Sequence, residues 1–358
     1  MKPDSAPASF GAVNPLRVLQ VGLGPHGRNW ARRVVPDLKE VELVAYVDSD
    51  PRALDLLREE GNVPADRCFE SLKEAIAATQ PEAVLITTAL PGHVPVIEAA
   101  LDAGLHVLVE KPFAPSVDAA RRLVDMAADK GLVLMVSQNY RFFPAPRALA
   151  SLVNESALGS LYEVSIDFRR YSPGQGRHQI EEQPLLVDMS IHHFDLLRLI
   201  LNREPQRIYC EAWNPEWAAF GGPSVAVASI VFEGGVVVSY RGSWVSAGPI
   251  TPWAGEWRLE FENGEVFWTG REDEGVLQDK VVVRPRQGKA RSVTLPMMRW
   301  TGGWATLAEF ADAVQTHREP DSSGRNNLGS IALMAAAVES ATQREVVAIS
   351  RSGEALAI

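Results

Sequence analysis

The sequence predicts an α/β domain with a doubly wound parallel sheet, followed by an α+β domain with a largely antiparallel open sheet. Strand-like and helical segments alternate up to about residue 138, and strand-like segments with few helices follow. A chain of 358 residues with 46% hydrophobic content can also bury two cores. We expect a disordered tail at 1–14, a first domain at 15–138 and a second domain at 139–358.

The first domain is predicted from short apolar runs rich in β-branched residues, at 16–21, 41–47, 83–87, 106–109 and 132–136. A helical segment follows the first run and is expected to stop at Pro36. Asp50-Pro51 is typical of an N-cap followed by proline at the first helical position. Ser71 and Glu74 are spaced as a capping box. Strands that alternate with helices in this way form a parallel sheet.

The second domain is predicted from alternating runs at 161–168, 207–213, 225–232, 236–244 and 257–261. Asn263-Gly264 is a hairpin signal, which favours antiparallel pairing. Two helical segments are expected near 306–314 and 327–342. Eight of the nine tryptophans lie between Trp213 and Trp304. We expect most of them in the sheet core, with sugar stacking or an oligomer interface as alternatives.

A glycine-rich run, Gly22-Leu-Gly-Pro-His-Gly27, directly follows the first predicted strand and opens a helix. Gly22 would permit a tight turn, Gly24 would let the backbone approach a pyrophosphate, and Gly27 would allow close helix packing. Asp48 ends the next strand, where it would bind a ribose 2'-hydroxyl and repel a 2'-phosphate. The context predicts a Rossmann domain that binds NAD in preference to NADP, although Arg52 could weaken that preference.

Asp188, His192 and Asp195 lie in an otherwise apolar segment at spacings of four and three, which predicts one shared helical face. A buried polar stripe needs partners or a substrate. The pattern is typical of a proton-transfer site. A satisfied core histidine with capping carboxylates is the alternative from the residues alone, and metal binding is a less favoured one.

Composition excludes several classes of function. A net charge of −10 and a pI near 5.3 argue against a nucleic-acid partner or an anionic membrane surface. Cys68 and Cys210 are too few for a disulfide framework and lack metal-ligand spacing. No stretch is apolar enough for a signal peptide or a membrane span, so we expect a cytoplasmic protein.

The chain resembles the glucose-fructose oxidoreductase / inositol dehydrogenase / MocA family over nearly its full length. The resemblance rests on the glycine run and four further motifs: Thr88-Ala-Leu-Pro-Gly-His93, Gly104-Leu-His-Val-Leu-Val-Glu-Lys-Pro112, Asp188-Met-Ser-Ile-His-His-Phe-Asp195 and Pro320-Asp-Ser-Ser-Gly-Arg-Asn-Asn-Leu328. It implies that Lys111, from the Glu-Lys-Pro triplet, points at the substrate beside the nicotinamide. It also implies that Asp188 and His192 form the acid-base pair and that Asp195 contacts substrate.

The resemblance places further residues at the cofactor: Pro25, His26, Thr88, His93, Glu110 and Asn139. Thr88, His93 and Glu110 could instead be strand-end caps. His193 has no role that transfers and is expected to pack. One departure concerns the substrate pocket, because many relatives carry glycines before the aspartate whereas this chain has the bulkier run 181–187. The substrate therefore cannot be transferred from familiar members.

These observations predict an NAD-dependent oxidoreductase that acts on a hydroxyl carbon of a sugar, polyol or cyclitol. His192 would be the base, Asp188 would orient it, and Lys111 would stabilise the alkoxide. No metal is required. The alternatives are an NAD-dependent glycosidase of the same fold, a non-catalytic NAD or sugar sensor, and a structural interaction protein. We also expect a homodimer or homotetramer formed through the C-terminal sheet.

Overall fold

The N-terminal part of the chain forms the predicted parallel sheet. The computed structural model describes residues 14–172, 174, 179, 181–270 and 278–349. Within them, six strands pair in the order β3-β2-β1-β4-β5-β6, and every pair is parallel. The strands are β1 (Leu16–Val21), β2 (Val41–Val47), β3 (Cys68–Phe69), β4 (Ala83–Ile86), β5 (His106–Val109) and β6 (Leu134–Val136). This order places a ligand crevice at the carboxyl ends of β1 and β4, where the winding reverses.

Helices connect these strands: α1 (Pro25–Asn29), α2 (Pro51–Gly61), α3 (Leu72–Thr79), α4 (Leu90–Asp102) and α5 (Val117–Asp129). The predicted caps are present, because Asp50 accepts from the Arg52 amide and Ser71 from the Glu74 amide. The first helix differs from the prediction. After α1 it continues as a π-helical turn at Trp30–Val34 and a 3-10 turn at Val35–Asp37, which tolerates Pro36 near its start.

The C-terminal part forms a large mixed sheet. Nine strands of the described chain pair in the order β14-β13-β12-β11-β7-β10-β9-β8-β15, with one parallel pair, β7 and β10. They are β7 (Leu161–Arg169), β8 (Pro205–Trp213), β9 (Val225–Phe232), β10 (Val237–Ser243), β11 (Glu256–Phe261), β12 (Gly264–Thr269), β13 (Lys280–Pro285), β14 (Arg291–Ser292) and β15 (Val347–Ala348). The predicted hairpin joins β11 to β12. The fold class is therefore confirmed.

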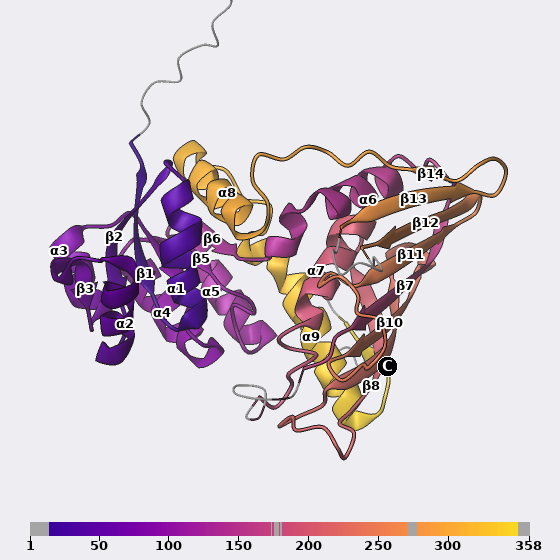
Figure 1. The fold of residues 1–358 in the computed structure, drawn as a ribbon, viewed down its shortest axis with the longest axis horizontal. Helices are drawn as coiled ribbons and strands as arrows, with labels where there is room; N and C mark the ends of the chain where they lie inside the picture. Colours follow the sequence, from indigo (N-terminus) through magenta and orange to yellow (C-terminus); the bar gives the residue numbers. More distant parts are fainter. Residues whose placement is uncertain (1–13, 173, 175–178, 180, 271–277, 350–358) are drawn as a thin grey trace, which may run out of the picture.

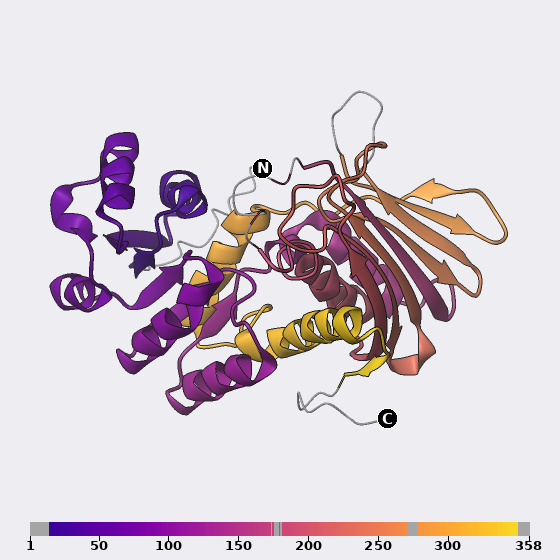
Figure 2. The ribbon, with the colours of Figure 1, turned by 90° about the horizontal axis from the view of Figure 1, so that it is seen from below.

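Three helices cover one face of this sheet: α6 (Pro144–Asn154), α7 (Ser190–Leu201) and α9 (Gly324–Gln343). Figures 1 and 2 show α7 and α9 between the two sheets. Apolar side chains of all three helices join the sheet in one core, with Leu149, Phe194 and Ile331 fully buried. Trp257 and Trp268 stack in that core with ring centroids 5.6 Å apart. The sequence pattern did not reveal α6, β13, β14 or β15.

The last helical pair reaches back to the first domain. Helix α8 (Gly302–Thr316) lies beside the parallel sheet (Figure 1), and its Leu307 and Phe310 are buried in the same core as Trp30. Ahead of α9, Ser322 exchanges hydrogen bonds of 2.8 and 2.7 Å with Val136 of β6. The predicted boundary at 138 thus marks where the first domain's strands end, whereas its core is completed by a segment far along the chain.

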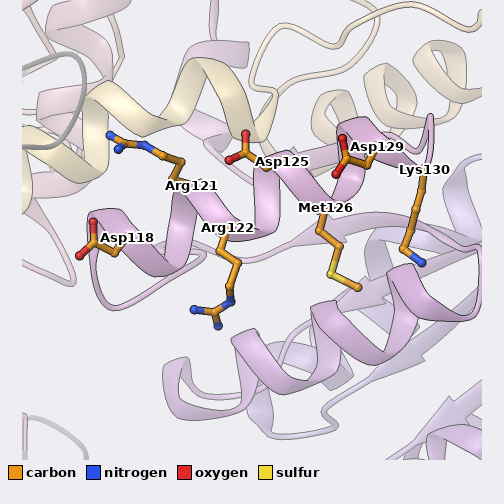
Figure 3. Close-up of a pocket in the computed structure, with 7 residues that line it drawn as sticks. All are labelled: Asp118, Arg121, Arg122, Asp125, Met126, Asp129 and Lys130. Atoms are coloured by element: carbon orange, nitrogen blue, oxygen red, sulfur yellow. The ribbon is translucent and has the colours of Figure 1, made fainter.

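A shallow hollow on α5 has a structural explanation. Figure 3 shows its charged side chains along the helix, with Arg122 and Lys130 on the side of the neighbouring helix. They pair with Glu98 and Asp102 of α4, at 2.8 and 3.2 Å. These charges join two helices. Among the described residues no helix is long and apolar enough to cross a bilayer. Oligomerisation and cellular location stay predictions.

Candidate active site

The glycine loop after β1 has the geometry that its motif predicts. Gly22 has φ +94°, and a Cβ there would lie 2.5 Å from the Thr88 amide nitrogen. A Cβ on Gly27 would lie 2.0 Å from the Gly22 carbonyl oxygen. By contrast, a Cβ on Gly24 would meet nothing within 4 Å. Gly22 and Gly27 are therefore required by the protein's own packing, whereas Gly24 leaves open a space that a ligand can enter.

Two buried polar residues hold this loop, and sequence reasoning missed both. The Gln20 amide donates to the Gly27 carbonyl at 2.8 Å and to the Thr87 hydroxyl at 3.0 Å. The Thr87 hydroxyl lies 2.6 Å from the Gly22 carbonyl, which accepts its hydrogen. Gln20 is a polar residue inside an apolar strand, and that break in the pattern was the available signal.

Asp48 lies at the end of β2, facing the glycine loop. Its carboxylate accepts hydrogen bonds from the amides of Leu23, at 2.6 Å, and Asp50, at 2.9 Å. Arg52 is held by Asp50 through two contacts of 3.1 Å. The cation that could have favoured NADP is therefore engaged by a neighbouring carboxylate in this structure.

His26 of α1 and Glu110, directly after β5, lie together. His26 Nε2 is 2.9 Å from Glu110 Oε1, which also accepts from the Trp30 indole at 2.9 Å. Burial raises the pKa of Glu110, but hydrogen bonds from His26 and Trp30 and the charge of Lys111 outweigh it, so the net pKa lies below its usual value. Glu110 is thus a carboxylate that ties the glycine loop to the end of β5.

His93 is buried between two backbone carbonyls. We expected it to line the cofactor, but its ring is 2% exposed and spans two backbone carbonyls. Nδ1 lies 2.9 Å from Pro112 O and Nε2 lies 3.0 Å from Thr88 O. Burial lowers the pKa of His93. The ring lies between the segment after β4 and the segment after β5, and its predicted contact with the cofactor stays a prediction.

Lys111 follows β5 and reaches across to the C-terminal domain. Its Nζ donates to Asp188 Oδ1 at 2.8 Å and to the Asp188 carbonyl at 2.7 Å. Both side chains are only about one-sixth exposed, at 15% and 16%. In a site shielded from water, this charge-assisted pair is stronger than a surface ion pair. The structure therefore brings together two of the three predicted catalytic residues.

His192 lies on α7 beside this pair. Its ring stacks on Tyr140 at a centroid distance of 4.2 Å and an interplanar angle of 14°. Nδ1 is buried and has no hydrogen-bond partner among the described residues. Burial, followed by the positive charge of Lys111, holds the pKa of His192 well below its ordinary value. The imidazole is therefore neutral at neutral pH, as a base must be.

Asp188 does not orient His192 as predicted. The described contacts of Asp188 include Lys111 but no hydrogen bond to His192. One reason is local structure, because α7 begins at Ser190 and Asp188 lies in the turn before it. The common helical face therefore applies to His192 and Asp195 only. Tyr140, which the sequence analysis missed, supplies the contact that fixes the His192 ring.

Asp195 is held inside the protein. It is 1% exposed and forms an ion pair with Arg141 from the 3-10 turn η4 (Asn139–Phe142). It also accepts hydrogen bonds from Ser330 at 2.8 Å and Asn327 at 3.3 Å. Both carboxylate oxygens have protein partners, so this geometry supports a positioning role that fixes α7 against α9 and η4. The predicted contact of Asp195 with substrate stays a prediction.

His192 Nδ1 is one of several buried polar atoms without a hydrogen-bond partner in the described chain; others are Thr88 Oγ1, the Gln138 side-chain amide and Asn139 Oδ1. Burying such atoms costs free energy of folding unless a ligand or a water molecule forms hydrogen bonds with them. Thr88 and Asn139 were predicted at the cofactor. His193 instead packs as expected, with its nitrogens 3.1 Å from Tyr240 Oη and 3.0 Å from Trp253 O. The described residues contain no cluster suited to a metal ion.

The fold and this crevice define a dinucleotide-binding oxidoreductase. Residues 16–138 match the model described as "Oxidoreductase family, NAD-binding Rossmann fold", and residues 147–266 match the "GFO/IDH/MocA C-terminal domain". The chain belongs to the GFO/IDH/MocA oxidoreductase family and carries its NAD-binding domain. The predicted resemblance is confirmed.

Known proteins agree with this assignment. The chain is 30% identical to the uncharacterized protein y4oX of Sinorhizobium fredii, covering 90% of this chain and 93% of that protein. It is 26% identical to D-apiose dehydrogenase of Paraburkholderia graminis, covering 87% and 84%. A solved oxidoreductase from Agrobacterium radiobacter, in complex with NAD+, L-tartaric acid and magnesium, has a TM-score of 0.81 at 21% identity, covering 93% and 98%.

Proposed function

We propose that this chain oxidises a hydroxyl-bearing carbon of a sugar, polyol or cyclitol, with NAD as the acceptor. Bound NAD supplies the hydride chemistry at its nicotinamide ring. The open space at Gly24 and the orphaned atoms of Thr88 and Asn139 fit such a group. Gly22, Gly24, Gly27 and Asp48 would hold it, the glycines at the pyrophosphate and Asp48 at the ribose.

The observation that carries the proposal is a shielded Lys111–Asp188 pair beside a neutral, buried His192. Lys111 would donate to the substrate oxygen and stabilise the negative charge that develops there. Neutral His192 would take the hydroxyl proton, since it is buried and its Nδ1 lacks a protein partner. Asp188 would hold the Lys111 ammonium in place, which is the role its contacts support.

A substrate panel tests this function. The protein is incubated with NAD and polyols, cyclitols, aldoses and aryl glycosides, while NADH and free aglycone are followed. We expect net NADH formation with at least one alcohol. Free aglycone without net NADH would instead identify the NAD-dependent glycosidase. Absence of both NAD binding and turnover would contradict the proposal and favour a structural protein.

The glycine loop offers a matched pair of variants. Gly24→Ala should leave thermal stability unchanged, because its Cβ enters open space, but should weaken NAD binding by about tenfold or more, roughly 1.4 kcal/mol. Gly27→Ala should lower the melting temperature, because its Cβ meets backbone 2.0 Å away. Calorimetric titration and thermal unfolding measure the two effects. Unchanged NAD affinity in Gly24→Ala would place the cofactor elsewhere.

The carboxylate of Asp48 should set cofactor preference. We expect NAD to bind at least about tenfold more tightly than NADP, because Asp48 would repel a 2'-phosphate and Arg52 is engaged by Asp50. Titration with both cofactors measures the ratio. Arg52→Gln is the control and should not raise the preference by more than about twofold. Equal affinities, or tighter NADP binding, would show that a cation dominates this corner of the site.

A further inference from the structure

Arg170 has an unusual environment for a half-buried cation. It directly follows β7, and its guanidinium carbon lies 4.2 Å from the centroid of the Trp253 ring. Its Nε and Nη2 atoms are buried, and neither has a hydrogen-bond partner in the described parts of the chain. Burial lowers the pKa of Arg170.

Neighbouring arginines show what Arg170 lacks. Arg198 pairs with Glu204 at 2.6 Å, Arg241 pairs with Asp167 at 2.8 Å, and Arg141 pairs with Asp195. Burying a guanidinium costs free energy unless hydrogen-bond acceptors pair with its N–H groups. Stacking on Trp253 leaves the in-plane N–H groups without acceptors. Arg170 is therefore poised to bind an acceptor that the protein does not provide.

The position of Arg170 links it to the catalytic residues. Burial raises the pKa of Tyr140, while the charges of Arg170 and Asp188 act on the same phenol in opposite directions. Tyr140 is the ring that stacks on His192. Trp253, which carries the Arg170 guanidinium, also lies beside His193 through its carbonyl oxygen. Arg170 is thus linked through Trp253 to His193, the residue next to His192 on α7.

We propose that the substrate carries a carboxylate, as an aldonic or uronic acid does, and that Arg170 binds this group. The inference rests on the proposed oxidation and names its substrate class. Adjacent Nε and Nη2 donors form the planar fork that suits the two oxygens of a carboxylate. Trp253 would keep the fork in one plane. Lys111 and His192 would then act on a hydroxyl of the same molecule.

The test uses matched neutral and acidic ligands: D-glucose and D-glucuronate, D-galactose and D-galacturonate, glucitol and gluconate. Binding to the NAD-loaded protein is measured by calorimetry. At least one acid should bind about tenfold or more tightly than its neutral partner. Arg170→Gln should reduce that preference to less than about threefold. It should leave affinity for the neutral ligand and for NAD within about twofold.

Arg241→Gln is the matched control, because Arg241 lies on the same sheet and pairs with Asp167 at 2.8 Å. It should keep the acid preference. The inference is overturned if no acid binds more tightly than its neutral partner, or if Arg170→Gln weakens both ligands equally. Preferential acid binding without NADH formation would overturn the proposed oxidation but keep the Arg170 site. NADH formation from neutral sugars alone would overturn the Arg170 site but keep the proposed oxidation.

Discussion

Replacing Lys111 by methionine should lower turnover by at least about 100-fold, or roughly 2.7 kcal/mol of transition-state stabilisation. Methionine keeps an unbranched apolar chain but removes the ammonium that pairs with Asp188 at 2.8 Å. The lost interaction belongs to the developing alkoxide, so NAD affinity should stay within about twofold. Steady-state kinetics and NAD titration measure the two quantities.

Lys130→Met is a matched control for that experiment. Lys130 pairs with Asp102 on the outside of the first domain and should be dispensable for turnover. Thermal unfolding would confirm that both variants are folded. Near wild-type turnover in Lys111→Met would remove this residue from the mechanism and leave the Lys111–Asp188 pair with a purely structural role between the domains.

Replacing His192 by alanine should also lower turnover by about 100-fold or more, the usual contribution of a general base. The pH dependence of turnover shows whether the loss comes from removal of the base. Burial and the charge of Lys111 hold the pKa of His192 well below its ordinary value, so the neutral base persists through neutral pH. The acidic limb of the turnover profile should therefore lie below pH of about 6.5 and be absent in His192→Ala.

Two variants that each remove one charge should shift the acidic limb in opposite directions. Lys111→Met removes a cation that disfavours imidazolium, so the acidic limb of its residual activity should move to higher pH. Asp188→Asn removes a negative charge and should move the limb to lower pH. A wild-type limb that persists with an unchanged midpoint in His192→Ala would show that another group is the base, with Lys111 the first suspect.

Local signals in the sequence predicted most of the strands and two helix starts of the first domain. Apolar runs gave its main strands, Asp50 and Ser71 gave two helix starts, and the glycine spacing gave the loop, because each depends on neighbouring residues. Helix α8 was expected as a helix, but its packing on the parallel sheet depends on contacts across more than 250 residues of chain. The hydrophobic periodicity of a segment does not indicate which distant residues it will contact.

The sequence predicted which residues form the candidate site better than it predicted the role of each one. Lys111, Asp188 and His192 lie together, yet spacing alone suggested that Asp188 would pair with His192 rather than Lys111. A spacing of four predicts a shared face only inside a helix, and α7 begins after Asp188. Tyr140 and Arg170 were missed because the sequence does not show which residues they contact. The stacking of Tyr140 on His192, and the lack of hydrogen-bond partners at two Arg170 nitrogens, are visible only in the structure.

The most direct test of the central claim follows deuterium from the substrate to the nicotinamide ring. The substrate found in the panel is prepared with deuterium on the carbon that is oxidised, and the reduced cofactor is examined by nuclear magnetic resonance. The account predicts one deuterium in each NADH formed, with formation slowed by at least about 100-fold in Lys111→Met. NADH without deuterium, or aglycone release without net NADH, would contradict hydride transfer from a carbinol carbon at this site.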